Sequence, residues 1–293
     1  MTDLLELLVS VGEAGCIYGL VALSYLLVLR PTGIINFAAG EWVRLGAFAG
    51  VTLIAQGKLP WIVGLPLAVL AVGLIGWLTE RLTIRPLVEG GASVLSPVLA
   101  LLGMLVVYRE SASLIWGVDN MFVPMPFGFG RVEVGPFAGS SQSFFILTIT
   151  AGVFLLVWLL FEKTVWGKAF EAVALNRMAA ALMGINLKLV AAMAFFGGAA
   201  VAGVAGLLVA PITSVHFLMG LPLAIKGFTA LVIGGVGRVE GALLGGLLLA
   251  LVEKLTLRYA PIPSGFAIGV PFVMLILFLM LRPGGLLRAK GGD

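Results

Sequence analysis

The sequence predicts an all-α, polytopic membrane protein with inverted repeats, broken or half helices and about nine apolar segments. The first observation is composition: 61% of the 293 residues are hydrophobic and only 11% are charged, against about 25% charged in soluble domains. The second is that uncharged stretches long enough to cross a bilayer alternate with short basic turns. The third is that glycine and proline interrupt two of these stretches at corresponding places.

Hydropathy sets the order of the segments. A helix crosses the roughly 30 Å hydrocarbon core with about 20 apolar residues. On this basis the apolar segments are 4–29, 33–55, 60–79, 93–117, 143–161, 189–210, 221–237, 239–257 and 264–281. Segment 93–117 can be one helix or two shorter ones, because it contains Pro97, Gly103 and the Arg109–Glu110 pair.

Basic residues orient the chain. Arg30 is the first cation after an apolar run, and the tail carries Arg282, Arg288 and Lys290. Because Lys and Arg next to spans favour the cytoplasm, we expect the amino terminus outside and the carboxyl terminus inside. The first span is expected to be retained, since no basic region and cleavage site precede it. The net charge of +4 lies in such turns, so no nucleic-acid partner is expected, whereas membrane lipid is.

A polar segment from 164 to 186 stands out between two apolar ones. It carries Lys168, Glu171 and Arg177 among small apolar residues, with Thr164 at an N-cap position and Gly184 at a helix end. We therefore expect one surface helix of several turns, on the cytoplasmic side, suited to transmit force to a soluble partner. Residues 162–188 are called the coupling loop below.

An internal repeat appears when the sequence is shifted by 180 positions, which aligns Pro31 with Pro211 and Gly40 with Gly220. The preceding spans run in opposite directions under the charge-derived orientation. Paired broken segments of this kind are typical of transporters with inverted repeats. We predict one transmembrane domain, 1–293, with repeats at about 5–120 and 185–281.

Polar residues in the broken segments are the candidates for a solute pathway. Glu41 and Arg44 share a helix face, and ionisable groups at membrane depth face water, a partner chain or each other. Their alternative role is an ion pair that fixes packing. A hydrogen-bonded interfacial role is the alternative for the only histidine, and snorkelling for the lysine. The pathway candidates are Asn36, Glu41, Arg44, Thr213, His216 and Lys226.

Motifs for catalysis are not found. The sequence has no G-x-x-x-x-G-K-[ST] phosphate loop, no H-E-x-x-H and no G-x-S-x-G. The one cysteine, Cys16, lies in an apolar run and allows neither an internal disulfide nor a cysteine metal cage. We expect no enzymatic activity, no metal and no cofactor in this chain.

Three motifs resemble the membrane permease of branched-chain amino acid ABC importers, the LivH/LivM type. They are INFAAGEWVRLGAF (35–48), GKAFEAVALNRMAAALMGIN (167–186) and IKGFTALVIGGVGRVEGALLGG (225–246). The resemblance implies a bacterial inner-membrane permease that pairs with a second, related permease chain. It also implies two ATPase subunits, which hold ATP and Mg²⁺, and a periplasmic solute-binding protein.

By the same resemblance, the coupling loop docks on the ATPase. The matching positions are Gly167, Ala172, Asn176, Ala179, Gly184 and Ile185, and the charged Lys168, Glu171 and Arg177 of the same loop are also assigned to ATPase coupling. Two residues depart from the family pattern: Ala39 stands where a histidine is common, and Glu171 where a basic residue is common. The first departure removes a polar pathway group and the second changes the charge facing the ATPase.

The function expected from the sequence is import of a small polar solute, a branched-chain amino acid in the first place. Urea, amides and aromatic acids are alternatives within the same importer class. An ion-coupled secondary transporter or channel is the alternative from a different class, and an intramembrane enzyme is a third.

Overall fold

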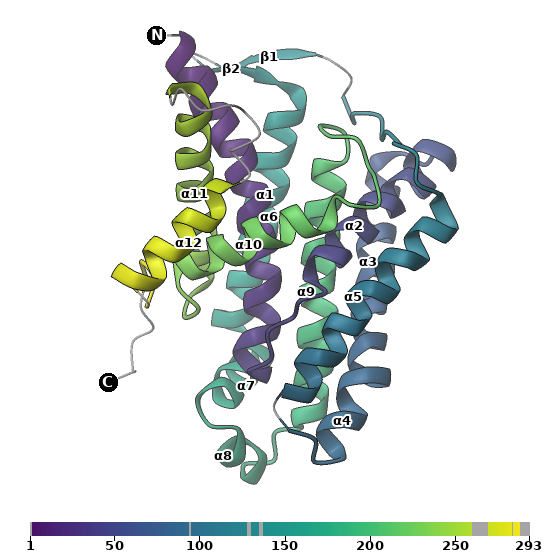
Figure 1. Ribbon diagram of the computed structural model, residues 1–293, viewed down its shortest axis with the longest axis vertical. Coiled ribbons are helices and arrows are strands. Elements are labelled where there is room, and N and C mark those ends of the chain that lie inside the picture. The colour runs from purple at the N-terminus through teal and green to yellow at the C-terminus, as the bar shows by residue number, and fades with distance from the viewer. Residues whose placement is uncertain are drawn as a thin grey trace. The chain divides into compact units, whose positions relative to one another are not determined.

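A computed structural model describes residues 2–93, 95–127, 130–134, 137–259, 269–282 and 284–287 (Figure 1). Helices dominate these ranges, in agreement with the predicted all-α class. The helices are α1 (Thr2–Thr32), α2 (Ala39–Gly50), α3 (Trp61–Thr79), α4 (Arg85–Glu89), α5 (Leu95–Trp116), α6 (Ser141–Lys163), α7 (Val165–Leu175), α8 (Arg177–Leu182), α9 (Leu187–Val209), α10 (Gly220–Gly234), α11 (Val239–Tyr259) and α12 (Val270–Leu281). Two π-helical segments, η1 (Val51–Gln56) and η2 (Glu80–Ile84), follow α2 and α3.

The number of spans is smaller than expected. Within the described residues, five helices are long and apolar enough to cross a membrane, or six segments if α10 and α11, bent by 117°, count as one. The expected count of about nine is therefore not confirmed. Hydropathy counted short apolar pieces such as α2 and α12 as crossings, although each has only 12 residues.

The structure adds two local details to the predicted segments. Segment 93–117 forms the single helix α5, because proline is tolerated in the first turn of a helix. The following loop contains an antiparallel pair of strands, β1 (Arg131–Val134) and β2 (Phe137–Ser140), in which Arg131 lies opposite Ser140. The basic tail residues Arg288 and Lys290 lie outside the described ranges.

Apolar side chains are exposed along several helices, as expected for a lipid-facing surface. Ile62 on α3 is 87% exposed, Leu114 on α5 is 86% exposed and Met280 on α12 is 76% exposed. Helices α1 and α9 are different, because 67% and 78% of their most apolar windows are buried. Exposed apolar area of this extent is not stable in water, so these faces require lipid or a partner.

One compact unit consists of Met1–Leu23, Pro124–Phe154 and Ile225–Asp293, within the described ranges. In it α1 packs closely on α11: a side chain at Gly15 would collide with Leu247, and one at Gly246 would collide with the backbone of Gly19. Glycines at such crossings let two helix backbones touch. The bent pair α10 and α11 is likewise closed by Gly245, which faces the carbonyl of Ala230.

The other unit consists of Ser24–Val123 and Leu155–Ala224. Its centre is α9, which packs on α2 and α3. Gly206 of α9 lies against the backbone of Val43, and Gly46 of α2 lies against Gly203. The repeat partners Gly40 and Gly220 also touch in this unit, since a side chain on either would meet the carbonyl of the other.

Both halves of the chain show the same order of elements. A long helix, a short helix after a break and a second long helix occur as α1, α2 and α3, and again as α9, α10 and α11. Neither compact unit coincides with one of these halves. The repeat boundaries at about 5–120 and 185–281 therefore stay predictions.

The polar segment 164–186 is two helices and not the single helix expected. Thr164 caps α7 by accepting a hydrogen bond from the Gly167 amide at 3.2 Å. Asn176 then ends α7 in an extended conformation and caps α8 by accepting from the Ala179 amide at 2.9 Å. An asparagine that can satisfy free amides breaks a helix and starts the next. Gly184, at φ +84°, ends the segment as predicted.

Candidate functional site

The coupling loop is anchored by an apolar cluster. Phe170 and Val173 of α7 and Ala180 of α8 pack with Val190 and Ala194 of α9, and all five are buried. Phe161 at the end of α6 stacks edge-on with Phe170 at 5.6 Å between ring centroids. Since α7 and α8 pack on the first turns of α9, the loop is held as a firm projection of that helix.

The opposite face of the loop is exposed and apolar. Leu175 is 78% exposed, Met178 77%, Leu182 84% and Met183 83%. These four side chains are called the apolar coupling patch below. Sequence reasoning missed them because it scored charges and small residues in this segment. Their spacing on the side of the loop away from Phe170 and Ala180 is the signal that would have found them.

The coupling residues named from the sequence divide into three groups. Gly167 is buried where α7 meets the end of α6, and a side chain there would collide with the carbonyls of Leu160 and Phe161. Ala172 and Ile185 are partly buried against the apolar cluster. The remaining six are exposed or half-exposed, namely Lys168, Glu171, Asn176, Arg177, Ala179 and Gly184.

Gly167, Ala172 and Ile185 therefore support the loop from within. Lys168 and Glu171 face each other at 3.4 Å and are 60% and 46% exposed, an ion pair of small energetic weight.

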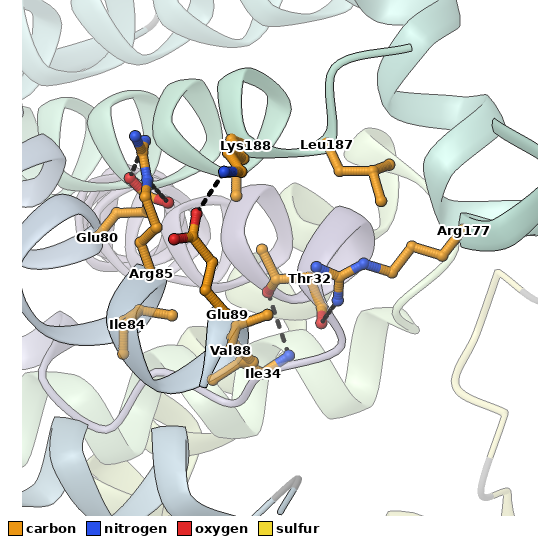
Figure 2. A pocket seen from close by; sticks show the side chains of 11 residues that line it. Thr32, Ile34, Glu80, Ile84, Arg85, Val88, Glu89, Arg177, Leu187 and Lys188 are labelled. Atoms are coloured by element: carbon orange, nitrogen blue, oxygen red, sulfur yellow. Dashed lines mark hydrogen bonds and ion pairs between the residues drawn. The ribbon is translucent and has the colours of Figure 1, made fainter. Parts of the chain in front are cut away.

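A cavity with a mainly apolar wall, to which several charged residues also belong, lies beside the coupling loop (Figure 2). Its volume is about 200 Å³, and it is bounded by the end of α1, by η2 and α4, by α8 and by the start of α9. Glu80 and Arg85 form a two-bonded pair at 3.1 and 2.7 Å, and Lys188 lies 2.6 Å from Glu89. Sequence reasoning did not predict this cavity, because its residues come from four separate stretches.

Asn36, Glu41 and Arg44 lie at the break before α2 and in its first turns, all buried. Glu41 and Arg44 form an ion pair, and Arg44 also donates to the backbone carbonyl of Phe217 at 2.5 Å. The pair thus joins α2 to the segment after α9. Asn36 accepts a hydrogen bond from the Ala38 amide at 3.0 Å, while its amide nitrogen has no partner within the described residues.

Thr213 and His216 lie in the segment between α9 and α10. His216 Nδ1 lies 3.1 Å from the Ser214 carbonyl, and Thr213 donates to the Val209 carbonyl at 3.3 Å. Neighbouring Val215 exchanges backbone hydrogen bonds with Met121 of the loop after α5. The histidine is therefore hydrogen-bonded and partly buried, in agreement with the hydrogen-bonded role considered for it.

Lys226 belongs to the other unit and lies in a three-residue network. Its ammonium donates to Glu253 at 2.6 Å and to the Tyr18 hydroxyl at 2.8 Å, and Tyr18 donates to the second oxygen of Glu253 at 2.9 Å. The network joins α1, α10 and α11. Snorkelling is thereby excluded, because the ammonium points to a carboxylate on a neighbouring helix. A glutamate in one apolar helix and a lysine in another indicate an ion pair within the membrane, and this pattern in the sequence would have predicted the network.

Known proteins resemble this chain over nearly its whole length. Residues 7–279 match the family model described as branched-chain amino acid transport system / permease component. The high-affinity branched-chain amino acid transport system permease protein LivH of Escherichia coli (strain K12) is 32% identical, with 93% of this chain and 92% of that protein covered. BraD, the corresponding protein of Pseudomonas aeruginosa, is 32% identical, with 97% and 95% covered.

A solved structure supports the fold alone. PsaBC from Streptococcus pneumoniae in complex with Fab superposes with a TM-score of 0.52 at 10% sequence identity, covering 95% of this chain and 91% of that one. The family match, the two relatives and the apolar helices agree. The chain belongs to the family of branched-chain amino acid transport system permease components, and it is a multi-pass membrane protein.

Proposed function

We propose that this chain is the permease subunit of an ATP-binding-cassette importer for branched-chain amino acids in a bacterial inner membrane. In this proposal it pairs with a second, related permease chain and receives its solute from a periplasmic binding protein. Two ATPase subunits, which hold ATP and Mg²⁺, dock on the coupling loop. The amino terminus lies outside and the carboxyl terminus in the cytoplasm.

The apolar coupling patch carries the ATPase part of this proposal. Leu175, Met178, Leu182 and Met183 are each more than three-quarters exposed and lie on a loop that α9 holds firmly. An exposed apolar group rimmed by charges marks a protein interface. Lys168, Glu171 and Arg177 are the exposed or half-exposed charged residues of the same loop.

Import requires a pathway for the solute. We propose that Asn36, Glu41 and Arg44 contribute to it in the unit that contains α2, α3 and α9. Thr213 and His216 are also proposed pathway residues, because they lie close in sequence to Phe217, whose carbonyl accepts a hydrogen bond from Arg44. The unpartnered amide nitrogen of buried Asn36 fits a group that binds water or solute. Lys226 is proposed to act as a pathway residue only when its ion pair with Glu253 is broken, because its ammonium is otherwise hydrogen-bonded to Glu253 and Tyr18.

The docking proposal is tested by placing a charge in the apolar coupling patch. In Leu182→Asp, copurification with the ATPase subunits should fall by about tenfold or more, because a buried unpaired carboxylate at an interface is strongly unfavourable. Charge reversal at Glu171 or Arg177 should weaken docking less, without loss of membrane insertion. Association is measured by affinity purification from detergent extracts followed by quantitative blotting.

The matched control is Phe122→Asp, in the loop after α5, where the side chain is 70% exposed. This variant should bind the ATPase like the unmodified chain. Equal ATPase recovery from Leu182→Asp and Phe122→Asp would contradict docking at the patch. Solute uptake by the chain alone in liposomes, without ATPase or binding protein, would instead support a secondary transporter.

A further inference from the structure

The cavity beside the coupling loop has the properties of a small-molecule site. It lies wholly within the unit that contains α2, α3 and α9, and its walls come from five elements. A volume of about 200 Å³ is below the roughly 300–1,000 Å³ of sites for drug-sized ligands. The cavity therefore suits a metabolite of the size of a single amino acid.

The charged side chains of the cavity differ in whether they can bind a ligand. Glu80 is 2% exposed and accepts hydrogen bonds from Arg85 through both of its carboxylate oxygens, so it has no free oxygen for a ligand. Glu89 makes a single contact with Lys188, at 2.6 Å, and these side chains are 47% and 62% exposed. Its second oxygen is accessible to a cation.

Arg177 supplies the complementary group. Figure 2 shows its guanidinium reaching from α8 toward Thr32 at the end of α1. Its hydrogen bond there is long, 3.3 Å, and uses one nitrogen, Nη1. A guanidinium has five donors in a planar fork that matches a carboxylate. Most of that capacity has no partner among the residues that the structure describes.

Apolar side chains occupy the rest of the wall. Ile34, Ile84, Val88 and Leu187 line the cavity together with the Glu89–Lys188 pair and Arg177. An isolated phosphate or lipid headgroup would lie beside two carboxylates and would leave the apolar wall unused. A ligand with one charge of each sign and a short hydrocarbon side chain would use all three features.

We propose that this cavity binds a free branched-chain amino acid on the cytoplasmic side. Its carboxylate binds Arg177, its ammonium binds Glu89, and its side chain lies against Ile34, Val88 and Leu187. The proposal rests on the proposed function, which supplies the solute class and the side of the membrane. It adds a second site, separate from the transport pathway.

Occupancy of this site has a mechanical consequence. The cavity lies between α8 of the coupling loop and the ends of α1 and α4. An amino acid bound to Arg177 of α8 and to Glu89 of α4 connects these two helices. A ligand that favours one arrangement of a two-state element opposes the other. The imported product therefore slows the ATP-driven cycle as it accumulates.

The test uses the complete importer in lipid nanodiscs, with binding protein saturated by leucine. Further free leucine should lower the stimulated ATPase rate about fivefold, the lower end of usual allosteric coupling. Leucinamide lacks the carboxylate and 4-methylpentanoate lacks the ammonium, so neither should inhibit. Inhibition by inorganic phosphate, or a dependence on anionic lipid in the nanodisc, would assign the cavity to an anion and overturn the proposal.

Two variants address the cavity directly. Val88→Trp fills it and Glu89→Gln removes the ammonium partner, and both should abolish inhibition by leucine while the stimulated rate is kept. The control Val107→Trp changes a similarly exposed valine on α5, 52% against 42% for Val88, and should leave inhibition intact. Inhibition of equal strength in all variants, or none in the unmodified importer, would overturn the proposal.

A binding measurement separates this proposal from the proposed function. Radiolabelled leucine is added to the importer without its binding protein, and retention is compared between the unmodified chain and Glu89→Gln. Leucine retention that is lost in Glu89→Gln supports binding in the cavity. If loaded binding protein also fails to stimulate ATP hydrolysis, that failure counts against the importer function and not against the cavity. Equal retention in both proteins counts against the cavity alone.

Discussion

Lys226 shows how one charged residue is stabilised inside an apolar helix. Its side chain is 21% exposed and that of its partner Glu253 is 10% exposed, so water screens the pair little. Tyr18 completes the network by donating to the carboxylate and accepting from the ammonium. Removing one member of such a pair leaves an uncompensated buried charge, whereas removing both leaves none.

The first prediction concerns this pair. Lys226→Met should lower the free energy of unfolding by about 3–5 kcal/mol, the usual result of breaking a buried ion pair. The double variant Lys226→Met with Glu253→Leu should recover most of the loss. Thermal unfolding in detergent measures both.

The control for this prediction is Arg238→Met. Arg238 and Glu240 form a pair in which both side chains are about half exposed, 54% and 47%. Such pairs contribute about 0–1 kcal/mol. A loss in Lys226→Met no larger than in Arg238→Met would show that the network does not stabilise the fold.

At the scale of elements, glycines determine which helices come together. Gly206 of α9 and Gly46 of α2 allow backbone contact in one unit, and Gly15 of α1 and Gly246 of α11 do the same in the other. Without a hydrophobic driving force between helices in lipid, close backbone packing is a main source of association. These glycines are therefore positions of contact more than of flexibility.

The second prediction compares two glycines. Gly206→Ala places a methyl group on the Val43 carbonyl, and backbone cannot move aside like a side chain. It should destabilise the protein by about 1–3 kcal/mol or more, as overpacking does. Gly103→Ala on α5 has nothing within 4 Å of the added carbon and should be neutral or stabilising by up to about 1 kcal/mol. Equal unfolding temperatures for the two variants would contradict the close packing of Gly206 against Val43.

The coupling loop illustrates how one polar side chain divides an element. Asn176 ends α7 and caps α8, which turns one expected helix into two. The turn places Phe170 and Ala180 on the same inner cluster while Leu175 and Leu182 are exposed. A straight helix over 164–186 would not present this arrangement.

At the scale of the whole molecule, orientation in the membrane is the central proposal. In this proposal the coupling loop lies in the cytoplasm and the loop after α5 outside, because basic residues at turns favour the cytoplasmic side. The only cysteine, Cys16, is 5% exposed, so Cys16→Ala gives a background for labelling with little disturbance. Phe122 and Met183 are exposed reporters, at 70% and 83%.

The third prediction follows from that topology. In spheroplasts expressing the chain without ATPase subunits, an impermeant maleimide should label Phe122→Cys and not Met183→Cys. Inside-out vesicles should show the reverse. Labelling of Met183→Cys from outside would place the coupling loop on the wrong side and would remove the ATPase docking proposal.

Much of the site was accessible from the sequence because it depends on local chemistry. Thr164 as a cap, Gly184 as a helix end and the Glu41–Arg44 pair follow from spacing of three residues and from turn propensity. The Lys226 network and the cavity beside the coupling loop were not accessible. Each brings together residues that spacing along the chain does not relate, such as Tyr18 with Glu253 or Arg177 with Thr32.

The sequence by itself determined that the chain is helical, lies in a membrane and carries one polar loop between apolar helices. These features depend on composition and on the length of each apolar stretch, which do not require contacts between distant segments. Only the tertiary structure decided which apolar segments are spans, where charges find partners and which side chains stay exposed. Those outcomes depend on contacts between distant segments, and hydropathy along a chain of similar apolar residues does not show which helix faces meet.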